Sequence, residues 1–269
     1  MKLCCTSWSF PACTLAEVAG ILKALGIEAV DLSFFYVSGL NRQKVLEQPK
    51  EVATELLSLE IQLSNFYFLF GNSLEERNLA EPSSLRANLE DFKKAVRFCS
   101  EVKIPSIMVL PGMINPGQTR EQALEQSAKS LQALLPIAQD AGITLAIEPH
   151  VHSYLESPTL TLELLARVPG LRLVLDYAHY TCLGYRQEEI DVLAPHAAHV
   201  HLRQARMGVL QSKLLEGTIN FATLMATLRA CGYDGYLALE YVHQDYMGTL
   251  YDDVLTETVK LRDLVRRFL

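Results

Sequence analysis

The sequence predicts an α/β fold, a (β/α)8 TIM barrel made by a single domain over residues 1–269. Three observations lead to this prediction. Eight short apolar runs occur along the chain, and amphipathic stretches long enough for helices separate them. The runs are rich in Val, Ile and Leu with little alternation, which is typical of parallel strands covered on both faces. Four of them directly follow a glycine that suits a left-handed helix end, in KALGIEAVDL, QDAGITLAIE, RVPGLRLVLD and RACGYDGYLALE.

The expected strands follow in chain order at 3–9, 27–32, 61–68, 106–110, 144–148, 171–176, 198–202 and 236–240. A doubly wound open sheet is the competing architecture. No G-x-G-x-x-G motif follows the first strand, which removes the usual dinucleotide-binding signal of that class. The barrel is therefore the preferred prediction.

Capping residues mark where the intervening helices should begin. Thr14 with Glu17 forms a capping-box pattern, and Ser83 or Ser84 is expected to cap the helix after the third strand. Further caps are expected at Thr119, at Ser157 before Pro158, and at Asn220. The last of these helices should bury a face made by Phe221, Leu224, Met225 and Leu228.

Composition narrows the function classes. The formal net charge is −7, and no basic block occurs, so a nucleic-acid partner is not expected. No run of about 18 apolar residues is present, which argues against a membrane span. The six cysteines form no C-x-x-C pair, and the N-terminus does not resemble a signal peptide, so reduced thiols in a cytoplasmic protein are expected.

Ionisable side chains stand at the ends of the last four expected strands. The fifth ends at Glu148, the sixth at Asp176 and the eighth at Glu240, and His201 lies near the end of the seventh. Neighbouring strands lie about 4.7–4.9 Å apart, so these groups can converge at the active face of a barrel. Burying three carboxylates together would cost several kcal/mol each without a cation. The pattern therefore predicts one divalent metal, and the donor set suits Mn²⁺ or Mg²⁺, with Co²⁺ or Zn²⁺ as alternatives.

The chain resembles the xylose isomerase-like TIM barrel superfamily, in particular its sugar phosphate isomerase/epimerase branch. The motifs that carry the resemblance are LAIEPH, VLDYAHY, HVHLRQA, EGTINF and GYDGYLALEY. The resemblance implies that Glu148, Asp176, His201 and Glu240 bind one divalent metal, commonly manganese, and that the two glutamates form the acid/base pair. It also implies that His179 lines the substrate site.

The implied activity is isomerisation or epimerisation of a sugar or related polyhydroxy-carbonyl compound. One glutamate removes the proton next to a carbonyl, which gives a metal-bound enediolate, and the other returns a proton. Proton return to another carbon is isomerisation, and return to the same carbon from the other face is epimerisation.

Several further residues are expected to contact a small-molecule substrate. His150 follows the fifth strand and Asn65 lies in the third. Gln204 follows the seventh strand. Characterised epimerases of the superfamily place an arginine where this chain has Met207, so Arg206 or Arg203 could bind a carboxylate or hydroxyl of the substrate, or else form a surface salt bridge. Aromatic residues at the ends of the first three strands could form an apolar wall, namely Trp8, Phe34, Phe35, Tyr36, Phe66, Tyr67 and Phe68.

Three other functions compete with this prediction. A dehydratase of the inosose or dehydroshikimate type would share the enolisation step. An apurinic endonuclease-like nuclease would need histidines from earlier strands, and every histidine here lies at position 150 or later. A non-catalytic ligand-binding barrel is the third alternative, and the sequence leaves assembly into a homo-oligomer open.

Overall fold

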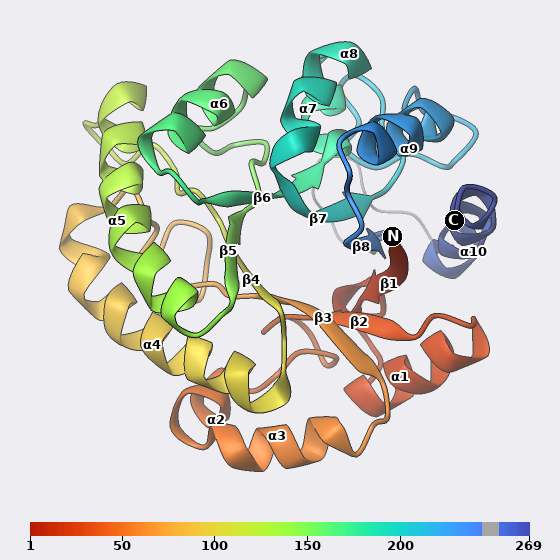
Figure 1. Cartoon of the computed structure of the whole chain (residues 1–269), viewed down its shortest axis with the longest axis horizontal. Coiled ribbons are helices and arrows are strands. Elements are labelled where there is room, and N and C mark those ends of the chain that lie inside the picture. Colours follow the sequence, from red (N-terminus) through yellow and green to blue (C-terminus); the bar gives the residue numbers. More distant parts are fainter. Residues whose placement is uncertain (244–252) are drawn as a thin grey trace.

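The computed structural model describes residues 1–243 and 253–269, and these contain a closed barrel of eight parallel strands (Figure 1). Each strand pairs with the next along the chain, and β1 pairs with β8 to close the ring. The (β/α)8 prediction is confirmed. The strands are β1 (Lys2–Thr6), β2 (Ala29–Leu32), β3 (Gln62–Tyr67), β4 (Ser106–Val109), β5 (Thr144–Ile147), β6 (Arg172–Asp176), β7 (Ala197–Leu202) and β8 (Tyr236–Leu239).

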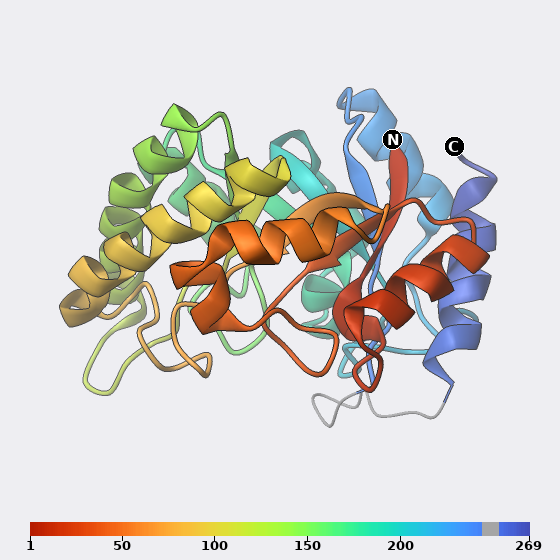
Figure 2. The same cartoon turned by 90° about the horizontal axis from the view of Figure 1, so that it is seen from below.

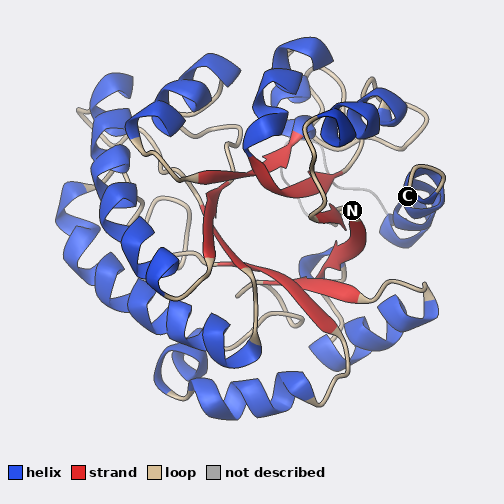
Figure 3. Ribbon diagram, in the orientation of Figure 1, coloured by secondary structure: helices blue, strands red, loops and turns tan. Residues whose placement is uncertain are grey.

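Helices surround the ring of strands on its outside (Figure 3). The longest, α4 and α5, cover neighbouring strands, and α10 returns the chain to the first helix, where Arg266 donates to the carbonyl oxygens of Leu25 and Gly26. The α-helices are α1 (Leu15–Ala24), α2 (Arg42–Glu47), α3 (Pro49–Leu57), α4 (Leu85–Val102), α5 (Arg120–Asp140), α6 (Pro158–Arg167), α7 (Tyr177–Cys182), α8 (Gln187–Ile190), α9 (Phe221–Ala230) and α10 (Val254–Arg266). The described residues also contain the 3₁₀ turns η1 (Ser7–Ser9), η2 (Pro82–Ser84) and η3 (Asp191–His196).

Most of the expected caps are present. Thr14 and Thr119 each accept a hydrogen bond from the third residue of their helix and form complete capping boxes. Ser157 and Asn220 cap α6 and α9 in the same way through their side chains. For the helix after β3, Ser84 stands at the N-cap of α4 as expected, but its side chain makes no capping hydrogen bond. The Glu81 carboxylate instead accepts from the Ser83 backbone N–H and caps η2.

All four predicted glycine helix ends adopt the left-handed backbone, for example Gly26 with φ 65° and Gly170 with φ 98°. The helix before β4 ends differently. Lys103 takes φ 58° there, and its backbone N–H bonds back to the last turn of α4. A motif search for glycine therefore misses this junction.

The first strand is shorter than predicted. It ends at Thr6, and the η1 turn follows at once, so Ser7, Trp8 and Ser9 leave the sheet. Thr6 and Ser9 share a side-chain hydrogen bond of 2.7 Å that closes this turn. The turn brings the Trp8 ring to the end of the barrel where the strands finish.

The core lies in two regions of different chemistry. Between the strands and helices it is apolar, and α9 buries the predicted Phe221, Leu224, Met225 and Leu228. The barrel interior instead holds buried polar groups, among them Asp31, Ser64, Asn65, Ser106 and His199. Buried polar groups need partners, and in this interior they bond mainly to one another across strands.

Long loops follow the carboxyl ends of the strands and gather at one edge of the barrel, opposite the N-terminus (Figure 2). This is the edge at which barrels carry their sites. Among the helices of residues 1–243 and 253–269, each is too short or too polar to cross a lipid bilayer.

Candidate active site

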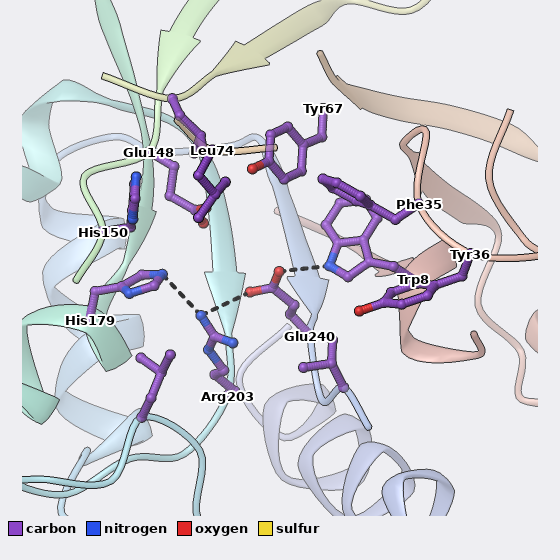
Figure 4. A pocket seen from close by; sticks show the side chains of 13 residues that line it. Trp8, Phe35, Tyr36, Tyr67, Leu74, Glu148, His150, His179, Arg203 and Glu240 are labelled. Atoms are coloured by element: carbon purple, nitrogen blue, oxygen red, sulfur yellow. Dashed lines mark hydrogen bonds and ion pairs between the residues drawn. The ribbon is translucent and has the colours of Figure 1, made fainter. Parts of the chain in front are cut away.

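A cavity of about 380 Å³ opens at the carboxyl ends of the strands (Figure 4). Ionisable side chains from β5 to β8 and their loops form one wall, and aromatic and aliphatic side chains form the other. The lining residues are Trp8, Phe35, Tyr36, Tyr67, Leu74, Leu110, Glu148, His150, His179, Arg203, Leu210, Glu240 and Val242. A cavity of this size suits one small ligand.

Three of the predicted metal ligands meet at the floor of this cavity. His201 Nδ1 lies 2.6 Å from Glu148 Oε1 and 3.3 Å from Glu240 Oε2. All three side chains are buried, and they come from three barrel positions: after β5, in β7 and after β8. Within the described residues, Glu240 Oε2 is buried without a hydrogen-bond partner.

Asp176, the fourth predicted ligand, lies beside this group and is tied to Arg203. Nε and Nη2 of the guanidinium lie 2.9 and 2.7 Å from Asp176 Oδ2, and Nη2 is also 3.5 Å from Glu240 Oε2. Asp176 Oδ1 accepts from the Ala178 backbone N–H at the start of α7. Arg203 therefore supplies a positive charge between two of the predicted ligands.

The buried groups of the described chain offer two sets of metal-ligand atoms at the mouth, and both contain Glu148. One set is Glu148 with His201 and Glu240, and the other is Glu148 with Asp176 and His179. The four predicted ligands thus come together in space, with Asp176 grouped through Glu148 rather than with His201 directly. Three carboxylates and an imidazole are the donor set that divalent ions such as Mn²⁺ or Mg²⁺ accept.

The two glutamates occupy different electrostatic environments. Burial raises the pKa of Glu148 to about 7, although the neighbouring His201 opposes this shift. Burial also acts to raise the pKa of Glu240, but attraction to His201 and Arg203 outweighs it and lowers that pKa to about 2. Trp8 Nε1 donates to Glu240 Oε1 at 2.9 Å and favours its ionised form further. Carboxyl groups separated in this way are suited to different roles in proton transfer.

His150 lines the cavity as predicted, and its hydrogen bonding fixes its tautomer. Nδ1 lies 2.7 Å from the Val151 carbonyl oxygen, which can only accept, so Nδ1 carries the proton. Nε2 is then a lone-pair acceptor, and it has no hydrogen-bond partner in the described part of the chain. Burial lowers the pKa of His150 to about 4, so the ring is neutral at physiological pH.

His179 also lines the cavity, at the place that the sequence predicts. The Val151 backbone N–H lies 3.2 Å from His179 Nδ1, and Arg203 Nη2 lies 3.0 Å from His179 Nε2. A neutral imidazole has one lone-pair nitrogen, so it accepts from only one of these two donors. Asp176, which contacts the guanidinium through both Nε and Nη2, holds it in position.

The aromatic wall contains four of the seven predicted side chains. Trp8, Phe35, Tyr36 and Tyr67 line the cavity, and edge-to-face contacts join Trp8 to Tyr67 at 5.9 Å and Phe35 to Tyr67 at 4.9 Å. The other three, Phe34, Phe66 and Phe68, pack against one another in the layer between strands and helices.

Three predicted substrate contacts do not reach the cavity. Asn65 lies within the barrel and accepts from Ser106 Oγ at 2.8 Å. Gln204 is buried, and its amide binds the loop before α9: Nε2 donates to Leu214 O and Ile219 O, and Oε1 accepts from Ile219 N. Arg206 is exposed and lies outside the lining residues.

Sequence reasoning missed Asp31, which lies in β2 directly beneath the floor of the cavity. Its Oδ2 is 2.6 Å from His199 Nε2 and 3.3 Å from His201 Nε2. The signal was present, because Asp31 stands near the end of AVDL just as Asp176 ends RLVLD. His199 makes this contact from β7, two residues before His201.

Comparison with known proteins agrees with this geometry. The model of the xylose isomerase-like TIM barrel family matches residues 20–263. A Xenopus laevis protein named "Putative hydroxypyruvate isomerase" is 26% identical over 257 residues, which cover 88% of each chain.

Solved structures share the fold at lower identity. The zinc-bound IolI protein is 16% identical and superposes with a TM-score of 0.77 over 100% of this chain and 99% of its own. A D-tagatose 3-epimerase-like protein is 18% identical with a TM-score of 0.76, over 100% and 97%. Because the family model spans most of the sequence, the chain belongs to the xylose isomerase-like TIM barrel family.

Proposed function

We propose that this protein is a divalent-cation-dependent isomerase or epimerase of a sugar, cyclitol or related polyhydroxy-carbonyl compound. The observation that carries the proposal is the meeting of Glu148 and Glu240 at His201 Nδ1, at 2.6 and 3.3 Å, on the floor of the cavity. The names of similar proteins, an isomerase and an epimerase-like protein, support the same reaction class.

The residues present fit a divalent cation. Glu240 Oε2 is a buried carboxylate oxygen with no hydrogen-bond partner in the described residues, and Glu148, Asp176 and His201 offer the remaining donors. We expect Mn²⁺, with Mg²⁺, Co²⁺ or Zn²⁺ as alternatives; zinc is bound in the similar IolI protein. When bound, the cation would polarise a substrate carbonyl and stabilise negative charge on its oxygen.

The side chains themselves would carry the proton transfer. One glutamate takes the proton from the carbon next to the carbonyl, and the other returns it to the adjacent carbon or to the opposite face. Trp8 holds Glu240 in place through its indole N–H. The aromatic wall excludes water from the reacting face and offers an apolar surface to the carbon skeleton.

Hydrogen-bonding groups around the cavity would orient the substrate. His150 Nε2 is an acceptor without a partner in the described structure, so it suits a substrate hydroxyl. Arg203 presents a donor on the same wall that suits a carbonyl or hydroxyl oxygen, and His179 lies beside it. Gln204, Arg206 and Asn65 are not part of this proposal, since they lie away from the cavity.

The test is a screen of ketoses, aldoses and inososes in deuterated water with Mn²⁺. Deuterium uptake into the substrate or its isomer supports the proposal, whereas a new enone absorbance supports the dehydratase alternative. Glu148→Gln and Glu240→Gln should each lower turnover roughly 10²–10⁴-fold while the fold persists. Glu55→Gln, on the exposed surface of α3, is the matched control and should keep the full rate. A near-wild-type rate in either active-site variant would remove that glutamate from the acid/base pair.

A further inference from the structure

The carboxylate of Asp31 lies at the centre of the barrel, completely buried, with donors from three other strands around it. Oδ1 accepts from Ser64 Oγ at 2.5 Å and lies 3.7 Å from Cys4 Sγ. Oδ2 lies 2.6 Å from His199 Nε2 and 3.3 Å from His201 Nε2. Burial of a charged carboxylate in such a position costs free energy, so we expect Asp31 to have a specific role.

His201 has one ring nitrogen on each side of the floor of the cavity. Nδ1 faces upward to Glu148 and Glu240, and Nε2 faces downward to Asp31. The contact with Asp31 is at ion-pair distance rather than a well-aligned hydrogen bond, and Nε2 has no other hydrogen-bond partner in the described residues. Both carboxylates can only accept: Glu148, at 2.6 Å, favours a proton on Nδ1, and Asp31 favours one on Nε2. Asp31 can therefore hold the proton on Nε2 once a cation occupies Nδ1.

His199 holds Asp31 in the position that His201 requires. The two imidazole rings are nearly perpendicular, at 88°, with their centres 5.4 Å apart. The short His199 contact and the Ser64 hydroxyl fix the two oxygens from different strands. The orientation of His201 is thereby set from beneath the site by residues that do not line the cavity.

We propose that Asp31 is a positioning residue, which holds the His201 ring so that Nδ1 carries the lone pair directed at the candidate cation site. The inference rests on the proposed function, since it gives His201 a cation to bind. Histidine ligands commonly donate their second ring N–H to a carboxylate, and loss of that partner typically lowers metal affinity by about 10- to 100-fold.

The experiment titrates the full-length protein with Mn²⁺ alone and follows binding by calorimetry. Asp31→Asn keeps the size of the side chain but removes its charge, and we expect Mn²⁺ affinity to fall roughly 10- to 100-fold. Ser130→Ala is the matched control, because it also removes one buried hydroxyl, which donates to Leu79 O from α5 and does not contact Asp31 or His201. Its Mn²⁺ affinity should stay within about threefold of wild type, well below the loss expected at Asp31.

A second measurement needs no variant. Nitrogen-15 spectra of the wild-type imidazoles, recorded with diamagnetic Zn²⁺, should show His201 bound to the cation through Nδ1 and protonated at Nε2. Cation binding through Nε2, or an Nε2 without a proton, would overturn the role of Asp31.

The two proposals fail in different ways. If wild-type protein binds no divalent cation, the proposed function loses its cation site and Asp31 loses its role with it. If wild type binds Mn²⁺ and Asp31→Asn binds it equally well, only the role of Asp31 is overturned.

Discussion

The two halves of the barrel mouth differ in chemistry although they share one architecture. The ends of β5 to β8 supply Glu148, Asp176, His201, Arg203 and Glu240, whereas the end of β3 and the segments after β1 and β2 supply Trp8, Phe35, Tyr36 and Tyr67. One half therefore holds charge in a fixed pattern, and the other gives the cavity its apolar shape. The difference indicates that reactivity and substrate shape are set by separate stretches of the chain.

Two residues of the β1 to β3 half contact the charged half. Trp8 donates to Glu240 from the aromatic wall, and Asp31 contacts His201 from beneath the floor. Each of these two residues contacts the charged half through one side-chain interaction. Variants at Trp8 and Asp31 therefore test whether these contacts serve the site or only the fold.

The largest effect on stability is expected when a positive charge is removed from the β5 to β8 half. Arg203→Met leaves Asp176 and Glu240 without their buried guanidinium, so the free energy of unfolding should fall by about 3–5 kcal/mol. Saturating Mn²⁺ should reduce this deficit, because the added cation would replace the lost charge. Denaturant unfolding with and without Mn²⁺ measures both quantities.

Arg42→Met, in α2 between β2 and β3, is the control variant for Arg203→Met. Arg42 donates to the carbonyl oxygens of Leu69, Phe70 and Gly71 after β3, far from the predicted ligands in sequence and outside the cavity lining. Its loss should destabilise the protein equally with or without Mn²⁺. A Mn²⁺-independent deficit in both variants would contradict the link between Arg203 and the cation.

A smaller effect is expected at the aromatic wall. Trp8→Phe keeps the apolar surface but removes the N–H that donates to Glu240, and hydrogen bonds to charged groups contribute about 1.5–3 kcal/mol. We expect kcat/KM to fall roughly 10- to 100-fold, mainly through kcat. Phe35→Leu changes the same wall without touching this bond, so its effect should lie in KM. Equal losses in kcat for the two variants would show that Trp8 contributes shape alone.

The smallest effect concerns the pH dependence of stability. His150 has its pKa lowered by burial to about 4, from an ordinary value of 6.5, so the unfolded chain binds a proton there at a higher pH than the folded protein. Stability is therefore lost as pH falls from about 6.5 toward 4, at roughly 1.4 kcal/mol per pH unit. Between pH 7 and 5, His150→Gln should lose roughly 1–2 kcal/mol less unfolding free energy than wild type. Parallel stability curves for the two proteins would contradict this account.

Strand ends were predictable from the sequence because apolar runs and glycine helix ends act locally. The same rule located Glu148, Asp176, His201 and Glu240, since it requires only that four strands finish at one edge. The prediction that Asn65 contacts the substrate was wrong because the pairing of β2 with β3 shifts register. Val30 pairs with Leu63 and Asp31 pairs with Asn65, so Ser64 has no paired residue in β2. A register shift depends on the partner strand, which a single segment of sequence does not reveal.

The loop after β7 shows the same limit. Gln204 and Arg206 lie soon after His201 in sequence, but the loop folds back on Gln204 and leaves Arg206 in solvent. Arg203 reaches the cavity instead, because it continues the strand two residues beyond His201 and faces the same side. Contacts of this kind are decided by tertiary structure.

The Gln204 amide has a consequence for how this chain can diverge. A side chain at Gly217, in the EGTINF motif, would place its Cβ 2.3 Å from Gln204 Cγ. Replacement of the glycine alone would displace Gln204 and release Ile219 from two hydrogen bonds. Positions 204 and 217 should therefore be inherited as a pair, with a larger residue at one tolerated only after the other has become smaller.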